Sequence, residues 1–156
     1  MKIKVLALGK KNDHFLKNET ELYLKRIQNY TDISLEILEY KPKSGSLPIE
    51  QLRQEETAYI LQHLPSTPYH AVFLDERGKS YTSMAFANYI QQKMNASCRQ
   101  LIFVIGGSYG WDQSMIKKQE QLRIGDFVLP HQLVRLVLAE QIYRACTIIK
   151  NENYHH

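Results

Sequence analysis

The chain has 156 residues, 44% hydrophobic and 23% charged, which suffices for one domain with its own core and is too short for two. A formal charge of +4 and a pI of about 9.0 allow an anionic partner without requiring one. No apolar run reaches membrane-span length, and the start MKIKVLALGK is too short in its apolar part for a secretion signal. With two cysteines that lack pair spacing, these features predict a cytoplasmic protein with reduced thiols.

The first half of the chain alternates strand and helix patterns. Lys2–Leu8 reads as a short strand, and Asn12 or Asp13 can cap a helix whose apolar residues recur at helical spacing. The pattern then predicts a strand at Asp32–Tyr40, a loop at 41–48 and a helix from about Ile49 to Leu64. The glutamates of this helix (Glu50, Glu55 and Glu56) predict an acidic face exposed to solvent.

The second half continues the alternation. We expect strands at His70–Leu74, Leu101–Ile105 and Leu122–Leu129, and helices from Thr82 or Ser83 to Met94, at Asp112–Gln119 and at about Gln132–Lys150. Residues 75–79 read as a polar turn after the first of these strands, where Asp75 and Glu76 form either a carboxylate pair or an ordinary solvated turn. The alternation predicts a single α/β domain over residues 1–156, with a mostly parallel sheet and helices on both faces.

A glycine-rich stretch follows the most apolar strand. Leu101–Ile105 stops at Gly106-Gly107-Ser108-Tyr109-Gly110, and glycines let backbone approach a ligand where a Cβ would block it. The stretch matches neither the dinucleotide fingerprint nor the P-loop, so an ordinary tight turn is an equal alternative. Because the carboxyl ends of parallel strands share one edge, we expect a ligand rim at the strand ends Leu74, Ile105 and Leu129.

The last expected helix is apolar around most of its circumference between Leu133 and Ile149. A helix of this kind is buried on several sides, either at a subunit interface or as a central core helix, and we favour the homodimer. The six histidines show no metal-ligand spacing, so we expect no metal.

Several motifs together carry a family resemblance. They are Leu74-Asp75-x-x-Gly78-Lys79, Ile105-Gly106-Gly107-Ser108-x-Gly110, Pro130-His131-Gln132-x-x-Arg135, Glu140-Gln141-x-Tyr143-Arg144-Ala145 and the terminal Tyr154-His155. Over essentially its whole length the chain resembles the ribosomal RNA large subunit methyltransferase H family of the SPOUT superfamily. One departure is the last residue, His156, where the family usually has a lysine or arginine.

The resemblance implies a C-terminal trefoil knot and a homodimer. It also implies methyl transfer from S-adenosylmethionine to N3 of a pseudouridine in 23S rRNA, in the assembled ribosome. The implied cofactor residues are Leu74, Gly106, Ile124, Gly125, Asp126, Phe127, Val128 and Leu129. Tyr154, His155 and Arg135 are the implied catalytic candidates, because the acceptor must be positioned and lose its N3 proton. The competing class is a nucleotide- or RNA-binding module without catalysis.

Overall fold

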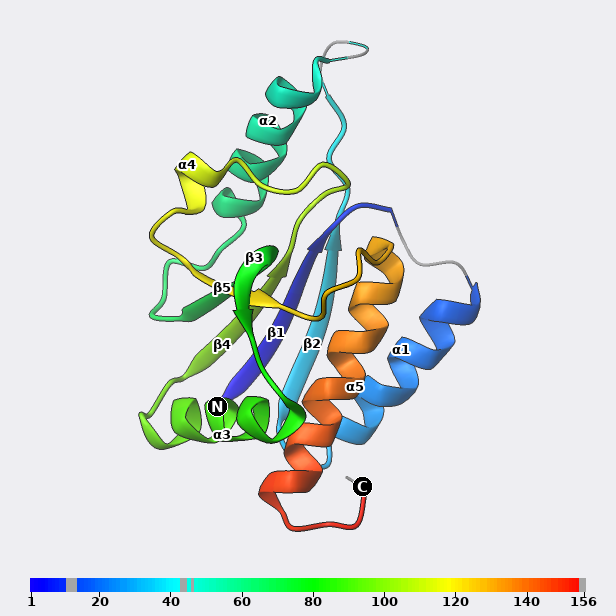
Figure 1. Ribbon diagram of the computed structural model, residues 1–156, viewed down its shortest axis with the longest axis vertical. Coiled ribbons are helices and arrows are strands. Elements are labelled where there is room, and N and C mark those ends of the chain that lie inside the picture. The colour runs from blue at the N-terminus through cyan, green and yellow to red at the C-terminus, as the bar shows by residue number, and fades with distance from the viewer. Residues whose placement is uncertain (11–13, 43–44, 46, 155–156) are drawn as a thin grey trace.

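The computed structural model describes every residue except 11–13, 43–44, 46 and 155–156 (Figure 1). Its centre is a five-stranded sheet in the order β2-β1-β4-β3-β5, and all four neighbouring pairs are parallel. The strands are β1 (Lys2–Leu8), β2 (Asp32–Leu38), β3 (His70–Ser80), β4 (Gln100–Ile105) and β5 (Glu120–Arg123). The parallel sheet expected from the alternating pattern is therefore confirmed.

Helices cover both faces of the sheet, as expected. The helices α1 (His14–Ile27), α3 (Ser83–Asn95) and α5 (His131–Ile149) pack on one face, and α2 (Ile49–Gln62) and α4 (Gln113–Ile116) on the other. Neighbouring residues of β1 serve opposite cores, because successive strand side chains point to opposite faces. Val5 packs with the first group of helices and Leu6 with the second. Thr82 caps α3 by accepting a hydrogen bond from the backbone N–H of Ala85, whereas the expected cap of α1 lies outside the described residues.

The polar turn expected at 75–79 is wrong, because β3 continues to Ser80. Its pairing with β5 is interrupted by a bulge: Leu74 and Lys79 both align with Leu122. At the bulge Gly78 lies so close to β5 that a Cβ built on it would be 2.5 Å from the backbone nitrogen of Leu122. Glycine is thus required here by a close approach of two backbones.

The fifth strand is shorter than expected, and the prediction of strand structure up to Leu129 is wrong. β3 ends at Ser80, which pairs with Arg123, so the chain beyond Arg123 has no partner strand. Residues 124–130 instead form a loop that returns past the sheet to the start of α5, which lies beside α1 (Figure 1). None of the helices in the described part of the chain is long and apolar enough to cross a membrane.

Candidate functional site

A cavity lies where β4 and β5 end and where β3 stops pairing with β4. It has a volume of about 490 Å³ and is lined by Leu74 of β3 and by the strand ends at Ile105 and Arg123. The glycine-rich loop (residues 106–110), the loop 124–129 and the first turn of α5 complete its walls. This is the edge at which open α/β sheets bind ligands, and we call it the rim cavity.

All eight residues expected to bind a cofactor line the rim cavity: Leu74, Gly106, Ile124, Gly125, Asp126, Phe127, Val128 and Leu129. The side chains of Phe127 and Val128 are 87% and 90% exposed, so the loop presents apolar surface to solvent in the single chain. Arg123 forms an ion pair with Asp126 at 3.0 Å, which ties this loop back to the end of β5.

Trp111 organises the wall between β3 and the glycine-rich loop. Its indole is buried against Phe73, and its Nε1 donates a hydrogen bond of 2.8 Å to the carbonyl oxygen of Leu74. A Cβ on Gly106 would lie 2.8 Å from Cε2 of this indole. Gly106 is therefore required by the packing of Trp111, a neighbour that the glycine pattern did not reveal. The one available signal was the position of the sole tryptophan directly after Gly110.

One face of α2 supports the glycine-rich loop. Arg53 donates from Nε to the carbonyl oxygen of Tyr109 at 3.0 Å, and the Thr57 hydroxyl accepts from the backbone N–H of Asp112 at 3.0 Å. Glu56 lies between them and faces Gly107, where an added Cβ would collide with its carboxylate. The three residues share a face because helix positions three and four apart are neighbours.

The prediction of a solvated acidic face on α2 is correct for Glu50 and wrong for Glu55 and Glu56. Glu50 is exposed and pairs with Arg53, whereas Glu55 is half-buried and accepts hydrogen bonds from Tyr40 and Gln51. Glu56 is half-buried as well, and burial raises the pKa of its carboxyl above the usual value. The acidic residues thus point in different directions around the helix.

Arg135 does not line the rim cavity. It is 2% exposed, and its guanidinium donates to the carbonyl oxygens of Lys10 and Leu8 at 2.9 and 3.3 Å. These bonds join the first turns of α5 to the end of β1. His131, one turn earlier on α5, does line the rim cavity, and burial together with the nearby Arg135 lowers its pKa.

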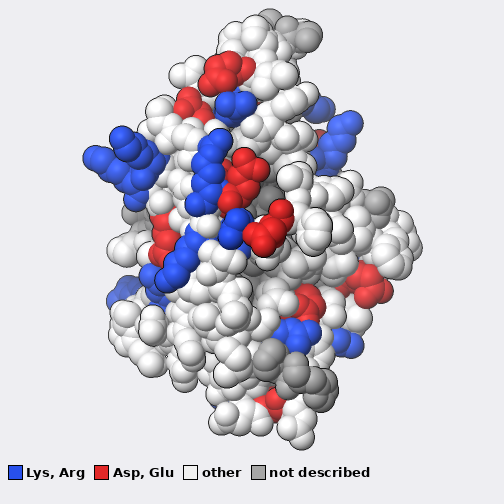
Figure 2. Space-filling view, in the orientation of Figure 1, with Lys and Arg blue, Asp and Glu red and all other residues white. Residues whose placement is uncertain are grey.

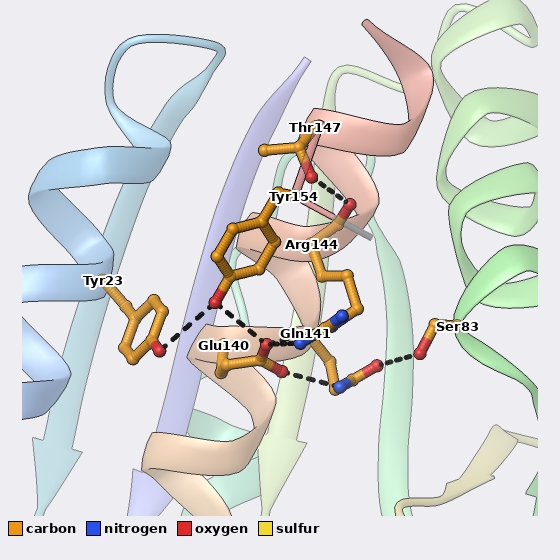
Figure 3. Close-up of polar contacts among 7 residues, drawn as sticks. All are labelled: Tyr23, Ser83, Glu140, Gln141, Arg144, Thr147 and Tyr154. Carbon is orange, nitrogen blue, oxygen red and sulfur yellow. Dashed lines mark hydrogen bonds and ion pairs between the residues drawn. The ribbon is translucent and has the colours of Figure 1, made fainter. Parts of the chain in front are cut away.

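Tyr154 follows the C-terminal end of α5, whereas the rim cavity is lined by residues from the start of that helix. Its hydroxyl is 3.3 Å from Oε1 of Glu140 and 3.4 Å from the hydroxyl of Tyr23 (Figure 3). Its ring packs edge-on against Tyr143. The guanidinium of Arg144 lies over the same ring, 4.9 Å from its centre. Glu140, the nearest of these contacts to the start of α5, follows the cavity-lining His131 by nine residues, or about 14 Å along the helix at 1.5 Å per residue. His155, the other tail candidate, lies outside the described residues.

Basic side chains gather on the face that carries β3 and α4, with acidic ones among them (Figure 2). Exposed lysines and arginines of these elements and of the turn after α4 are Arg77, Lys79, Lys117 and Lys118. Asp75 is not an isolated carboxylate, since it accepts hydrogen bonds from the backbone of Arg77 and the side chain of Gln113. Within the described residues no cluster of histidine, cysteine or acidic side chains could hold a metal ion.

A parallel α/β sheet with a cavity at its edge, closed by a glycine-rich loop, defines a ligand-binding α/β protein. Residues 1–155 match the family model described as "Predicted SPOUT methyltransferase". Proteins named ribosomal RNA large subunit methyltransferase H are similar over the whole chain. The one from Cytophaga hutchinsonii is 40% identical over 158 residues, covering 100% of both chains. Those from Christiangramia forsetii and Ruminiclostridium cellulolyticum are 38% and 39% identical, covering at least 99% of each chain.

The chain therefore belongs to the SPOUT methyltransferase family, and within it to the ribosomal RNA large subunit methyltransferase H family. The knotted fold that the resemblance implied follows from this membership. The resemblance found in the sequence motifs is confirmed.

Proposed function

We propose that this chain is an S-adenosylmethionine-dependent methyltransferase that modifies N3 of a pseudouridine in 23S rRNA, working as a homodimer on the assembled ribosome. The observation that carries the proposal is the convergence of all eight expected cofactor residues on the rim cavity, in a chain of this family. The names of its relatives support a large-subunit rRNA as the acceptor.

The residues of the rim cavity fit S-adenosylmethionine. The volume of about 490 Å³ is within the usual range of about 300–1,000 Å³ for small-molecule sites. Leu74, Ile124 and Leu129 offer apolar surface for an adenine, and Gly125 leaves the loop backbone open, since nothing lies within 4 Å of a Cβ placed there. When bound, the cofactor supplies a methyl group on a positively charged sulfur.

The dimer is supported by apolar surface that the single chain leaves exposed. The core face of α5 is filled by residues such as Leu138 and Ile142, so burial within the chain explains part of its apolar circumference. Leu133, Leu136 and Val137 remain half-exposed on the same helix, close in sequence to the exposed Phe127 and Val128. A second copy packed there would bury this surface, as homodimers commonly do.

The contacts of Tyr154 support a site built by two subunits. Its ring and hydroxyl are held by Tyr23, Glu140, Tyr143 and Arg144, and none of these residues lines the rim cavity of the same chain. We infer that the tail of one subunit completes the site of the other, where Tyr154 and His155 contact the acceptor base. Arg135, whose guanidinium bonds to backbone, then acts by fixing the first turns of α5.

The alternative is a binding module without catalysis. A methylation assay distinguishes the methyltransferase from the binding module. Purified ribosomes that lack the modification are incubated with the protein and methyl-labelled S-adenosylmethionine. We expect label on one pseudouridine of 23S rRNA, located by nuclease mapping, with little transfer to free 23S rRNA. Cofactor binding without transfer to any ribosomal RNA would support the binding module, and transfer to another nucleotide would refute the proposed acceptor.

A further inference from the structure

A second cavity lies beside the rim cavity, across the glycine-rich loop. Its volume is about 600 Å³, and it is bounded by the ends of β1 and β2, one side of α2 and the first turns of α5. Gly107, Ser108 and His131 line both cavities. Two ligands bound in the two cavities would therefore meet at these three residues. None of the eight expected cofactor positions is among the described residues that line the second cavity.

Glu56 is the chemically distinctive residue of the second cavity. Its Oε2 atom is closed off from solvent and has no hydrogen-bond partner in the described part of the chain. A buried carboxylate oxygen left without a partner is costly and rare. Protein atoms cover this oxygen, so the carboxylate has to turn toward the cavity to gain a ligand as its partner. The same carboxylate abuts Gly107, one of the three residues shared by both cavities.

We propose that the second cavity holds the acceptor base of the RNA and that Glu56 accepts the proton of its N3–H group. This inference rests on the proposed function. The other walls suit a nucleotide: Tyr40 offers a half-exposed aromatic ring for stacking, and Lys10 and Lys41 are exposed at the edge of the cavity, where phosphates would pass.

In the proposed methyl transfer two bonds break and two bonds form. Glu56 takes the N3 proton as the N–H bond breaks, and the electron pair left on N3 forms the bond to the incoming methyl carbon. The pair of the broken carbon–sulfur bond stays on sulfur, which loses its positive charge. Glu56 ends as a neutral acid and returns its proton to water after the product leaves.

Burial raises the pKa of Glu56, which makes its carboxylate a better proton acceptor than an exposed one. Other titratable or charged groups line the cavity from every side, so a pH profile must be assigned by substitution. They are Lys10 from the end of β1, Glu39, Tyr40 and Lys41 from the end of β2, and His131 and Arg135 from α5.

The test compares Glu56→Gln with the wild type and with Glu50→Gln, which removes the same charge from an exposed position of the same helix. Single-turnover methylation of ribosomes is measured between pH 5 and 8, together with calorimetric cofactor binding and thermal unfolding. For Glu56→Gln we expect transfer at least about a hundredfold slower. The fall in rate toward acidic pH should disappear, while cofactor affinity stays within about twofold and the unfolding temperature does not drop. Glu50→Gln should match the wild type.

Three results would overturn the inference. The first is a wild-type rate in Glu56→Gln. The second is a fall in rate toward acidic pH that persists in Glu56→Gln, which would indicate His131, and the third is a loss of rate with an equal loss of unfolding temperature, which would indicate a structural role. Gly107→Ala gives an independent check, because its methyl group would displace the Glu56 carboxylate without removing it. It should slow transfer as well. If the wild-type protein transfers no methyl group to ribosomes, the proposed function is refuted rather than the role of Glu56 within it. The unfolding temperatures would then still report on the burial of Glu56.

Discussion

Glu56 and Trp111 show how single residues outside the recognised motifs shape the site. Each contacts a glycine of the glycine-rich loop: Glu56 abuts Gly107 and Trp111 abuts Gly106. The sequence identified the glycines as positions where backbone approaches a ligand, and the structure places a protein side chain against each of them. The approach of a ligand stays a prediction. A glycine pattern indicates missing side-chain volume, and only the fold determines whether a ligand or another side chain occupies that space.

Replacing Gly106 with valine should therefore act through Trp111. The added side chain would push the indole away and break its hydrogen bond to the Leu74 carbonyl. We expect S-adenosylmethionine affinity to fall at least about tenfold, or roughly 1.4 kcal/mol, by calorimetry. Because Trp111 is the sole tryptophan, its fluorescence should shift in the same variant. Unchanged affinity together with shifted fluorescence would show that Trp111 does not shape the cofactor site.

The candidate site was predictable in part from the sequence. The cofactor positions followed from the resemblance, and all of them line one cavity. Glu56 could not be predicted, because helical periodicity placed it with Glu50 and Glu55 among charged residues, and no pattern indicated which of the three points inward. The direction of a charged side chain on an amphipathic helix depends on which neighbours pack against it.

At the scale of elements, the bulge in β3 accounts for the largest departure from the predicted secondary structure. Alternation and apolar runs located β1, β2 and β4 closely, because a strand buried in a sheet imposes its own pattern. The end of β5 was not predictable from Phe127 to Leu129, since an apolar run looks the same in a strand and in an exposed binding loop. Its true end is set by pairing, which stops when β3 runs out at Ser80.

Gly78 should be the position where a small change disrupts this arrangement most. In Gly78→Ala the new methyl group would lie within 2.6 Å of three backbone atoms of β5, which cannot rotate away. We expect a loss of about 1–3 kcal/mol in the free energy of unfolding, measured with urea. Gly125→Ala is the matched control, since its Cβ meets open space and should cost little. Equal stabilities of the two variants would refute the close approach.

For the whole molecule, the apolar side chains left on α5 lead to a prediction about association. Val137→Glu should give monomers or aggregates, because a carboxylate buried at the interface without a partner costs several kcal/mol. Gln91→Glu, at an exposed position of α3, should leave the dimer intact. Sedimentation at micromolar concentration provides the measurement. A soluble monomer of the unmodified chain would contradict the homodimer.

The central claim is that one subunit supplies the rim cavity and the other supplies the tail, and mixing two defective chains tests it most directly. One chain lacks residues 154–156 and alone should transfer methyl groups to ribosomes at least about a hundredfold more slowly than the wild type. The other carries Gly106→Val and alone, with the cofactor kept below its dissociation constant, should be at least about tenfold slower. After random subunit exchange, half of the dimers are mixed and each mixed dimer has one intact site, so the account predicts roughly a quarter of wild-type activity. If the tail served its own subunit, no mixed dimer would contain an intact site, and activity that stays at the level of the separate variants would contradict the account.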